Sequence, residues 1–287
     1  MKGGFILFNG KFYRDSDPLF TGADFFRLNG GVRESFRAEN NLVTFARDNF
    51  DFLLNSLEAI DLPVPAEWNF PRFSRDVSRL LNKNHHYLAA RVIIHLIQGN
   101  PGTEYLMSSE EITSGFYPLK ENGILIDFYE DGTKGSSSFS PFEPSSRSLW
   151  GSATRALSSL SRQNLILLNT HGFACESIGG SFGYLTSKTA VFPSLESRGY
   201  APSIMQVVKS CTEELGYLIQ EKKEIKREEL LNADELFLID NCLGIEPVLG
   251  LYARRYYTTG SLAIAAKLRE RAREQHLSTQ ISDKEIF

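Results

Sequence analysis

The sequence predicts a mixed protein of helices and strands divided into two domains, and three observations support this prediction. Short apolar runs flank turn residues at Asn9-Gly10 and again within 165–185, which is the pattern of a β-hairpin. Apolar residues recur at helical spacing in longer segments, which are 44–60, 71–82, 148–160, 204–215 and 261–274. The stretch TSGFYPLKENG is rich in turn formers and is typical of a linker. We therefore expect a small N-terminal α+β domain over 1–115, a linker over 116–122 and a larger C-terminal domain over 123–287.

The composition limits the classes of molecule that we expect the protein to bind. The chain has 287 residues, of which 42% are hydrophobic and 23% charged, so it has enough apolar material for one large or two ordinary domains. Its net charge of -4 offers no basic face for a nucleic acid or an anionic membrane. Small molecules and proteins remain as partners.

The cysteines and the N-terminus indicate a cytoplasmic protein. Cys175, Cys211 and Cys242 are widely spaced in apolar surroundings, which is typical of reduced, buried thiols and not of a disulfide framework. The first apolar run is too short for a signal peptide, and no stretch approaches the roughly 18 apolar residues of a membrane span.

The sequence of the N-terminal half predicts two helices with strands before and after them. A strand pair surrounds Asn9-Gly10, and the helix over 71–82 has proline at its first position. A long strand is expected over 86–99, where Arg91 shares one face with Ile93 and His95. The histidines of this region have no carboxylate or thiol at ligand spacing, so we expect no metal site.

The C-terminal half predicts a strand over 124–129, followed by a serine-rich loop that contains Lys134. A helix over 148–160 precedes the hairpin LILLNTHGFACESIGGSFGYL, whose second strand carries Glu176.

This hairpin resembles the core of class IV aminotransferases, the family that also includes branched-chain and D-amino acid aminotransferases and 4-amino-4-deoxychorismate lyase. Glu176 falls where the family's glutamate pairs with the pyridine nitrogen of pyridoxal phosphate (PLP). The match extends in order over nearly the whole chain, from Gly22-Ala23-Asp24-Phe25-Phe26-Arg27 to Gly244-Ile245-Glu246-Pro247-Val248. It implies the fold type IV of PLP enzymes, a larger domain with a barrel-like mixed sheet, PLP as cofactor and a homodimer.

The resemblance also assigns the reactive position. Every active relative forms a Schiff base between PLP and a lysine just before the helix that packs under the cofactor. Counting back from Glu176 places Arg147 there, and a guanidinium that stays protonated cannot condense with an aldehyde. The nearest lysines are Lys134 and Lys188, and either could act only if the backbone ran differently from the family.

The remaining cofactor positions are mostly substituted. Phe52 stands at the arginine that holds the phosphate, a contact that no aromatic ring replaces. The other family positions at the phosphate fall on Ser181, Tyr200, Ala201, Asn241 and Cys242. Arg91 is the candidate for the substrate carboxylate.

By resemblance the chain is a protein similar to class IV aminotransferases and aminodeoxychorismate lyase, with a small amino or carboxylate ligand. Because Arg147 stands at the lysine position, we expect standard PLP catalysis to be absent. Three alternatives stay open: a PLP transaminase or lyase with a displaced lysine, a PLP-independent binding or partner protein (a pseudoenzyme), and a PLP-independent enzyme that binds an anion through Arg147, Glu176 and Arg91. A lysine amine beside Glu176 would favour the first alternative.

Overall fold

The computed structural model of the protein describes residues 4–19, 31–99, 102–113, 115–142 and 148–284. The contacts of the chain divide it into two compact units. Unit 1 comprises Met1–Phe116, Glu143–Ser146 and Ala272–Phe287, and unit 2 comprises Tyr117–Phe142 and Arg147–Arg271. The predicted family element over 22–27 and the predicted Arg147 position lie outside the described residues.

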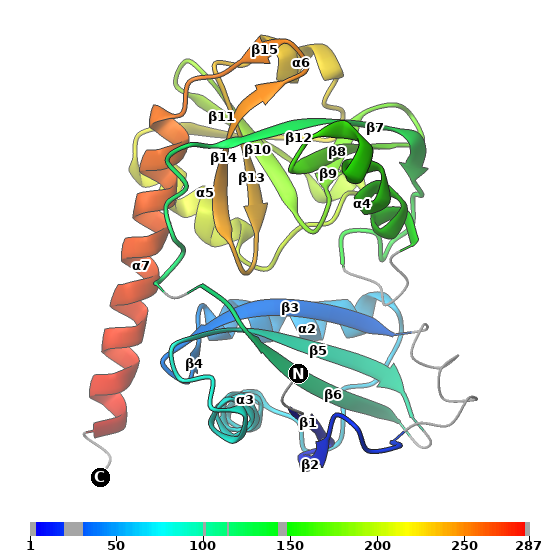
Figure 1. Ribbon diagram of the computed structural model, residues 1–287, viewed down its shortest axis with the longest axis vertical. Coiled ribbons are helices and arrows are strands. Elements are labelled where there is room, and N and C mark those ends of the chain that lie inside the picture. The colour runs from blue at the N-terminus through cyan, green and yellow to red at the C-terminus, as the bar shows by residue number, and fades with distance from the viewer. Residues whose placement is uncertain (1–3, 20–30, 100–101, 114, 143–147, 285–287) are drawn as a thin grey trace. The chain divides into compact units, whose positions relative to one another are not determined.

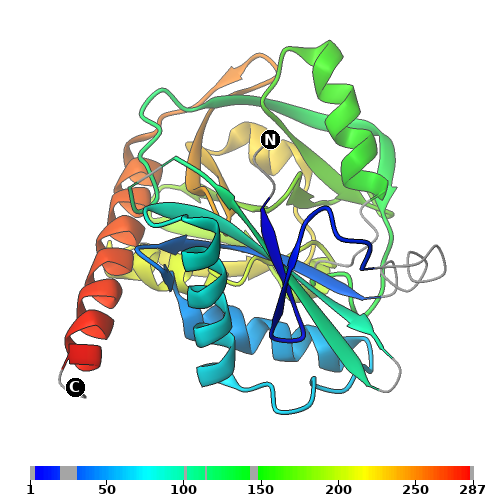
Figure 2. The same ribbon diagram turned by 60° about the horizontal axis from the view of Figure 1, so that its bottom comes forward.

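Unit 1 is built on an antiparallel sheet with the strand order β2-β1-β6-β5-β3-β4 (Figure 1). The strands are β1 (Phe5–Phe8), β2 (Lys11–Arg14), β3 (Val32–Glu39), β4 (Leu42–Val43), β5 (Ala89–Gln98) and β6 (Thr103–Glu111). The helices are α2 (Ala46–Ala59) and α3 (Phe70–Asn84), shown from another side in Figure 2. Because the buried strand residues of the core, such as Phe36, Val92 and Met107, share one face of the sheet, both helices cover that face.

Local sequence signals explain the ends of these elements. Asn9 and Gly10 both have positive φ angles, 47° and 81°, which is the backbone that a tight hairpin turn requires. The side chain of Asn69 caps α3 by accepting a hydrogen bond from the backbone of Arg72 at 3.0 Å. The predicted hairpin and helix are therefore confirmed, each at the position that its turn or cap residues mark.

Unit 2 contains a mixed sheet with the order β12-β11-β10-β13-β14-β7-β8-β9, which curls into a half-barrel (Figure 1). Its strands are β7 (Ile124–Lys134), β8 (Asn164–Asn169), β9 (Ala174–Ser177), β10 (Ser181–Thr186), β11 (Thr189–Pro193), β12 (Leu218–Lys222), β13 (Glu235–Asp240), β14 (Gly244–Leu251) and the short β15 (Arg254–Arg255) beside β14. Its helices are α4 (Ser148–Leu160), α5 (Met205–Glu214), α6 (Arg227–Asn232) and α7 (Thr259–Lys284), of which the last continues into unit 1 at Ala272. None of the helices in the described ranges is long and apolar enough to span a membrane.

The predicted hairpin forms from β8 and β9. The Asn169 side chain accepts hydrogen bonds from the backbone of His171 and Phe173, at 3.0 and 3.1 Å, and thereby closes the turn. The pairing of β8 with β9 is antiparallel and brings Glu176 opposite Leu167. The hairpin prediction is confirmed.

The strand before α4 differs from the prediction. The sequence predicts that this strand ends at 129 and that Lys134 lies in a loop, whereas β7 continues to Lys134. The register with β8 shifts between Phe128 and Thr133, after which Thr133 and Lys134 pair with Leu168 and Asn169. A bulge therefore interrupts the strand without ending it, and the sequence pattern alone resembles a strand end at that point.

Candidate active site

The buried carboxylate of Glu176 is the centre of the candidate site. The side chain has an exposed fraction of 0% and accepts hydrogen bonds from three donors. Oε2 accepts from Lys134 Nζ at 2.7 Å and from the backbone of Tyr200 at 2.7 Å. Oε1 accepts from Trp150 Nε1 at 2.8 Å. A carboxylate removed from water must be satisfied in this way, because an unpaired buried charge is costly.

Each donor comes from a different element of unit 2. Lys134 ends β7, Trp150 lies in the first turn of α4, and Tyr200 lies in the loop before α5. The side chain of Lys134 is 14% exposed, and its ammonium lies 5.9 Å from the centre of the Trp150 ring. The lysine amine beside Glu176 thus comes from a residue 42 positions upstream in the sequence.

The thiol of Cys175, the residue before Glu176, is held in its neutral form. Burial raises the pKa of Cys175 far above its usual range, the charge of Glu176 raises it further, and Lys134 only partly opposes these effects. The thiol therefore stays protonated near neutral pH and does not act as a nucleophile.

A second set of hydrogen bonds, made by the Asn241 side chain, connects Tyr200 with the start of α5. The Asn241 side chain donates from Nδ2 to the Tyr200 hydroxyl at 3.1 Å. Its Oδ1 accepts from the Ser203 hydroxyl at 3.0 Å and from the backbone amide of Ile204, the N-cap residue of α5, at 3.3 Å. A hydroxyl and an amide at the N-terminus of a helix are suitable donors for an anion, and here they bind an amide oxygen of the protein itself.

Three further predicted positions lie in unit 2. Ser181 begins β10, is 1% exposed, and its hydroxyl has no hydrogen-bond partner among the described residues. The Ala201 amide donates to the Pro141 carbonyl at 2.9 Å. Cys242 is buried, and its amide donates to the Asp240 carboxylate at 2.7 Å.

The other two described positions lie in unit 1. Phe52 is half-buried in α2, and its carbonyl accepts a hydrogen bond from the Ser56 hydroxyl at 2.7 Å. Arg91 is partly exposed on β5, with its guanidinium 4.0 Å from the Glu110 carboxylate. Both residues therefore belong to a different compact unit from Glu176 and its three donors.

Trp150 is the site residue that the sequence analysis missed. A lone tryptophan in the first turn of an amphipathic helix suggests core packing, but a buried indole N–H also needs an acceptor. The need of a buried indole N–H for an acceptor is the only signal that the sequence of α4 offers for this contact. In the part of the chain that the structure describes, no group of three or more His, Cys, Asp or Glu residues is arranged to hold a metal ion.

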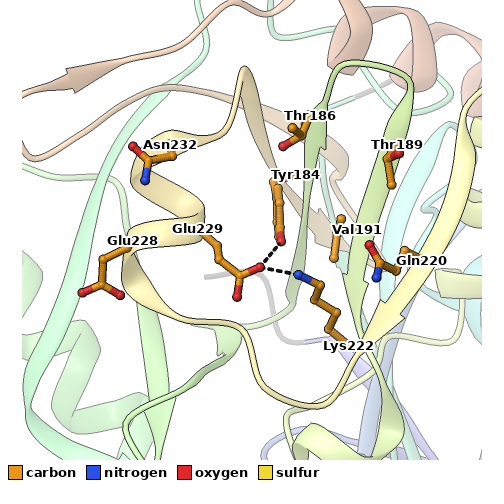
Figure 3. Close-up of a pocket in the computed structure, with 9 residues that line it drawn as sticks. All are labelled: Tyr184, Thr186, Thr189, Val191, Gln220, Lys222, Glu228, Glu229 and Asn232. Atoms are coloured by element: carbon orange, nitrogen blue, oxygen red, sulfur yellow. Dashed lines mark hydrogen bonds and ion pairs between the residues drawn. The ribbon is translucent and has the colours of Figure 1, made fainter.

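A separate polar hollow of about 420 Å³ lies on the face of β10, β11 and β12 beside α6 (Figure 3). Within it the Glu229 carboxylate pairs with the Lys222 ammonium and accepts a hydrogen bond from the Tyr184 hydroxyl at 2.9 Å. Burial raises the pKa of Tyr184 and its bond to Glu229 raises it further. These groups satisfy one another and connect α6 with the sheet. Glu176 and its three donors are not among the residues that line the hollow.

Comparisons with known proteins give a fold but no sequence family. No protein-family model matches the chain, and no curated protein matches it. A branched-chain aminotransferase from Thermoproteus uzoniensis with norvaline has a TM-score of 0.76 at 20% identity, over 94% of each chain. The branched-chain amino acid aminotransferase from Escherichia coli has a TM-score of 0.78 at 16% identity, over 92% of each chain.

A hypothetical aminotransferase from Mycobacterium tuberculosis, with α-ketoglutarate and PMP bound, has a TM-score of 0.80 at 16% identity, over 94% of this chain and 98% of that one. These similarities span both compact units at low sequence identity. The chain therefore has the class IV aminotransferase fold, as the sequence predicted.

Proposed function

We propose that the protein is a PLP-dependent enzyme with the class IV aminotransferase fold, acting on a small amino acid or related carboxylate, and that Lys134 is its reactive lysine. The observation that carries this proposal is the 2.7 Å contact between Lys134 Nζ and the fully buried carboxylate of Glu176. The similar protein from Mycobacterium tuberculosis has structures with PMP and with PLP bound, which supports the choice of cofactor.

The residues present suit the aldehyde and ring ends of PLP. When bound, PLP supplies an aldehyde that condenses with a primary amine and a ring that withdraws electrons from the substrate. Lys134 is a primary amine held in a largely buried place, and Glu176 is an acceptor for a protonated ring nitrogen. Trp150 and the Tyr200 amide keep Glu176 hydrogen-bonded after the lysine has turned away from it.

The fit of the site to the phosphate end of PLP is weaker, but the chain offers hydrogen-bond donors there. The Ser203 hydroxyl and the Ile204 amide at the start of α5 would hold the phosphate once the Asn241 side chain turns away from them. The unpartnered hydroxyl of Ser181 is a further donor that nothing in the described residues satisfies. These donors are neutral groups and not a guanidinium, so we expect modest affinity for PLP.

Lys134 Nζ has two roles within this proposal. As a free amine it is a nucleophile, and as an ammonium beside Glu176 it holds a proton that it can give to a neighbouring atom. A single lysine with both roles is what amino-group transfer requires. With Lys134 as the reactive lysine, the connection between the lysine and α4 is longer than the short connection that the family pattern implies.

The test is an absorbance spectrum with and without added PLP, followed by borohydride reduction and peptide mass analysis. We expect a visible band and a pyridoxyl mass on the peptide that contains Lys134. Lys134→Ala should lose both signals, whereas Lys188→Ala, a change in the exposed turn after β10, should keep them. A wild-type protein without a band, or an adduct confined to another lysine, would refute the proposal.

A second candidate is a PLP-independent binding or partner protein. The observation that favours it is that both ends of the site are already satisfied by the chain, through Trp150 and Lys134 on Glu176 and through Asn241 at the start of α5. A site completed by its own side chains requires no cofactor. The absence of both band and adduct in the wild-type protein would support this candidate.

A further inference from the structure

Trp150 contacts the groups that surround Glu176. Its side chain is 9% exposed, and its indole N–H donates to Glu176 Oε1 at 2.8 Å. Its ring meets the Tyr200 ring edge to face, with centroids 5.4 Å apart and planes at 76°. The Lys134 ammonium lies 5.9 Å from the same ring. A single side chain of α4 therefore touches the acid and both of its other donors.

The two oxygens of Glu176 are not equivalent. Oε1 accepts from Trp150, whereas Oε2 accepts from Lys134 and from the Tyr200 amide. If the Lys134 amine leaves Glu176 to condense with an aldehyde, with loss of water, Oε2 loses one donor and Oε1 loses none. An indole N–H can only donate, so Trp150 has no reason to leave the carboxylate.

We propose that Trp150 is a positioning residue that, together with the Tyr200 amide, fixes the plane of the Glu176 carboxylate and directs Oε2 toward the cofactor's ring nitrogen. This inference rests on the proposed function. The position on Oε2 that the lysine ammonium leaves would then be open to the ring N–H. Ring recognition then depends on a tryptophan that acts through the Glu176 carboxylate.

The other tryptophan shows that a buried indole in this chain does not by itself imply such a bond. Trp68 is 5% exposed, yet its indole nitrogen has no hydrogen-bond partner among the described residues, and its ring packs against Phe50, Phe73 and Tyr105. Trp68 fills a core, whereas Trp150 joins its N–H to a charged acceptor. Hydrogen bonds to charged groups contribute more than those between neutral groups.

The test compares two ligands that cannot condense with Lys134. One is pyridoxamine phosphate, and the other is the same molecule with a carbon in place of the ring nitrogen. We expect Trp150→Phe to weaken binding of pyridoxamine phosphate by about tenfold, measured by calorimetry, because one hydrogen bond to a charged group is lost. Binding of the nitrogen-free ligand should be unchanged. Trp68→Phe is the control and should change neither affinity.

The outcomes separate this inference from the proposed function. Equal losses for both ligands would show that Trp150 only shapes the site, and an unchanged affinity for pyridoxamine phosphate would show that it does not act on the ring. Either result, obtained with a PLP adduct on Lys134 in the wild-type protein, refutes the inference alone. A wild-type protein that forms no adduct and binds neither ligand refutes the inference and the proposed function together.

Discussion

The burial of His276 should make the stability of unit 1 depend on pH. This residue of α7 is 4% exposed, with Nε2 3.3 Å from the Thr44 hydroxyl and its ring 4.7 Å from that of Phe116. Its Nδ1 has no hydrogen-bond partner in the described residues. Burial lowers the pKa of His276 from 6.5 to about 4, because a charged imidazolium would lose its hydration there.

The sign and size of the effect follow from proton binding. Between pH 6.5 and pH 4 the unfolded chain binds a proton at His276 and the folded chain does not. The stabilising contribution is therefore complete above pH 6.5 and is lost progressively as the pH falls toward 4. At about 1.4 kcal/mol for each unit of pKa difference, the free energy of unfolding should fall by roughly 3 kcal/mol over this range.

The assay is urea unfolding at a series of pH values from 7.5 to 4.5, followed by circular dichroism. His276→Leu removes the titrating group, so its free energy of unfolding should depend less steeply on pH than that of the wild-type protein. His171→Leu, in the exposed turn between β8 and β9, is the matched control and should keep the wild-type slope. Equal slopes for wild type and His276→Leu would refute the reasoning, whatever their stabilities at pH 7.5.

Three other changes test the candidate site and its surroundings. Asn241→Ser should free the two donors at the start of α5 and tighten PLP binding several-fold in an absorbance titration, and an unchanged affinity would show that the amide does not compete. Glu229→Gln should cost about 1–3 kcal/mol in urea unfolding, because it breaks a partly buried ion pair, and should lower the pKa of Tyr184 in an ultraviolet titration. Gly199→Ala should prevent stable folding, since an added Cβ would lie 1.8 Å from the Cys175 carbonyl oxygen, and a wild-type melting temperature would contradict this.

Local signals made much of the fold predictable. The turn at Asn9-Gly10 requires positive φ angles that few residues adopt, so two adjacent residues determine where β1 and β2 reverse. The hairpin that holds Glu176 is closed by the Asn169 side chain, which accepts hydrogen bonds from the backbone two and four residues further on. The segment Leu165–Leu168 of β8 is apolar because both faces of that strand are buried.

The contact between Lys134 and Glu176 was not predictable by the same means. Counting residues assumes that the chain between two positions has a fixed length, but the bulge in β7 and its continuation to Lys134 change that length. The bond between Trp150 and Glu176 joins positions 26 residues apart on a helix and a strand. The hydrophobic periodicity of each segment does not indicate this contact, because the contact arises from tertiary packing.

The arrangement around Glu176 is itself an argument for a lysine that moves. A structural ion pair needs only its two members, and removing one partner of a buried pair typically costs about 3–5 kcal/mol. Here the Trp150 indole and the Tyr200 amide would still donate to both carboxylate oxygens if the Lys134 ammonium turned away. The departure of the lysine would therefore cost less than the breaking of an isolated pair. A lysine that must leave its carboxylate in order to react requires this property, and a lysine that serves only as a counter-ion does not.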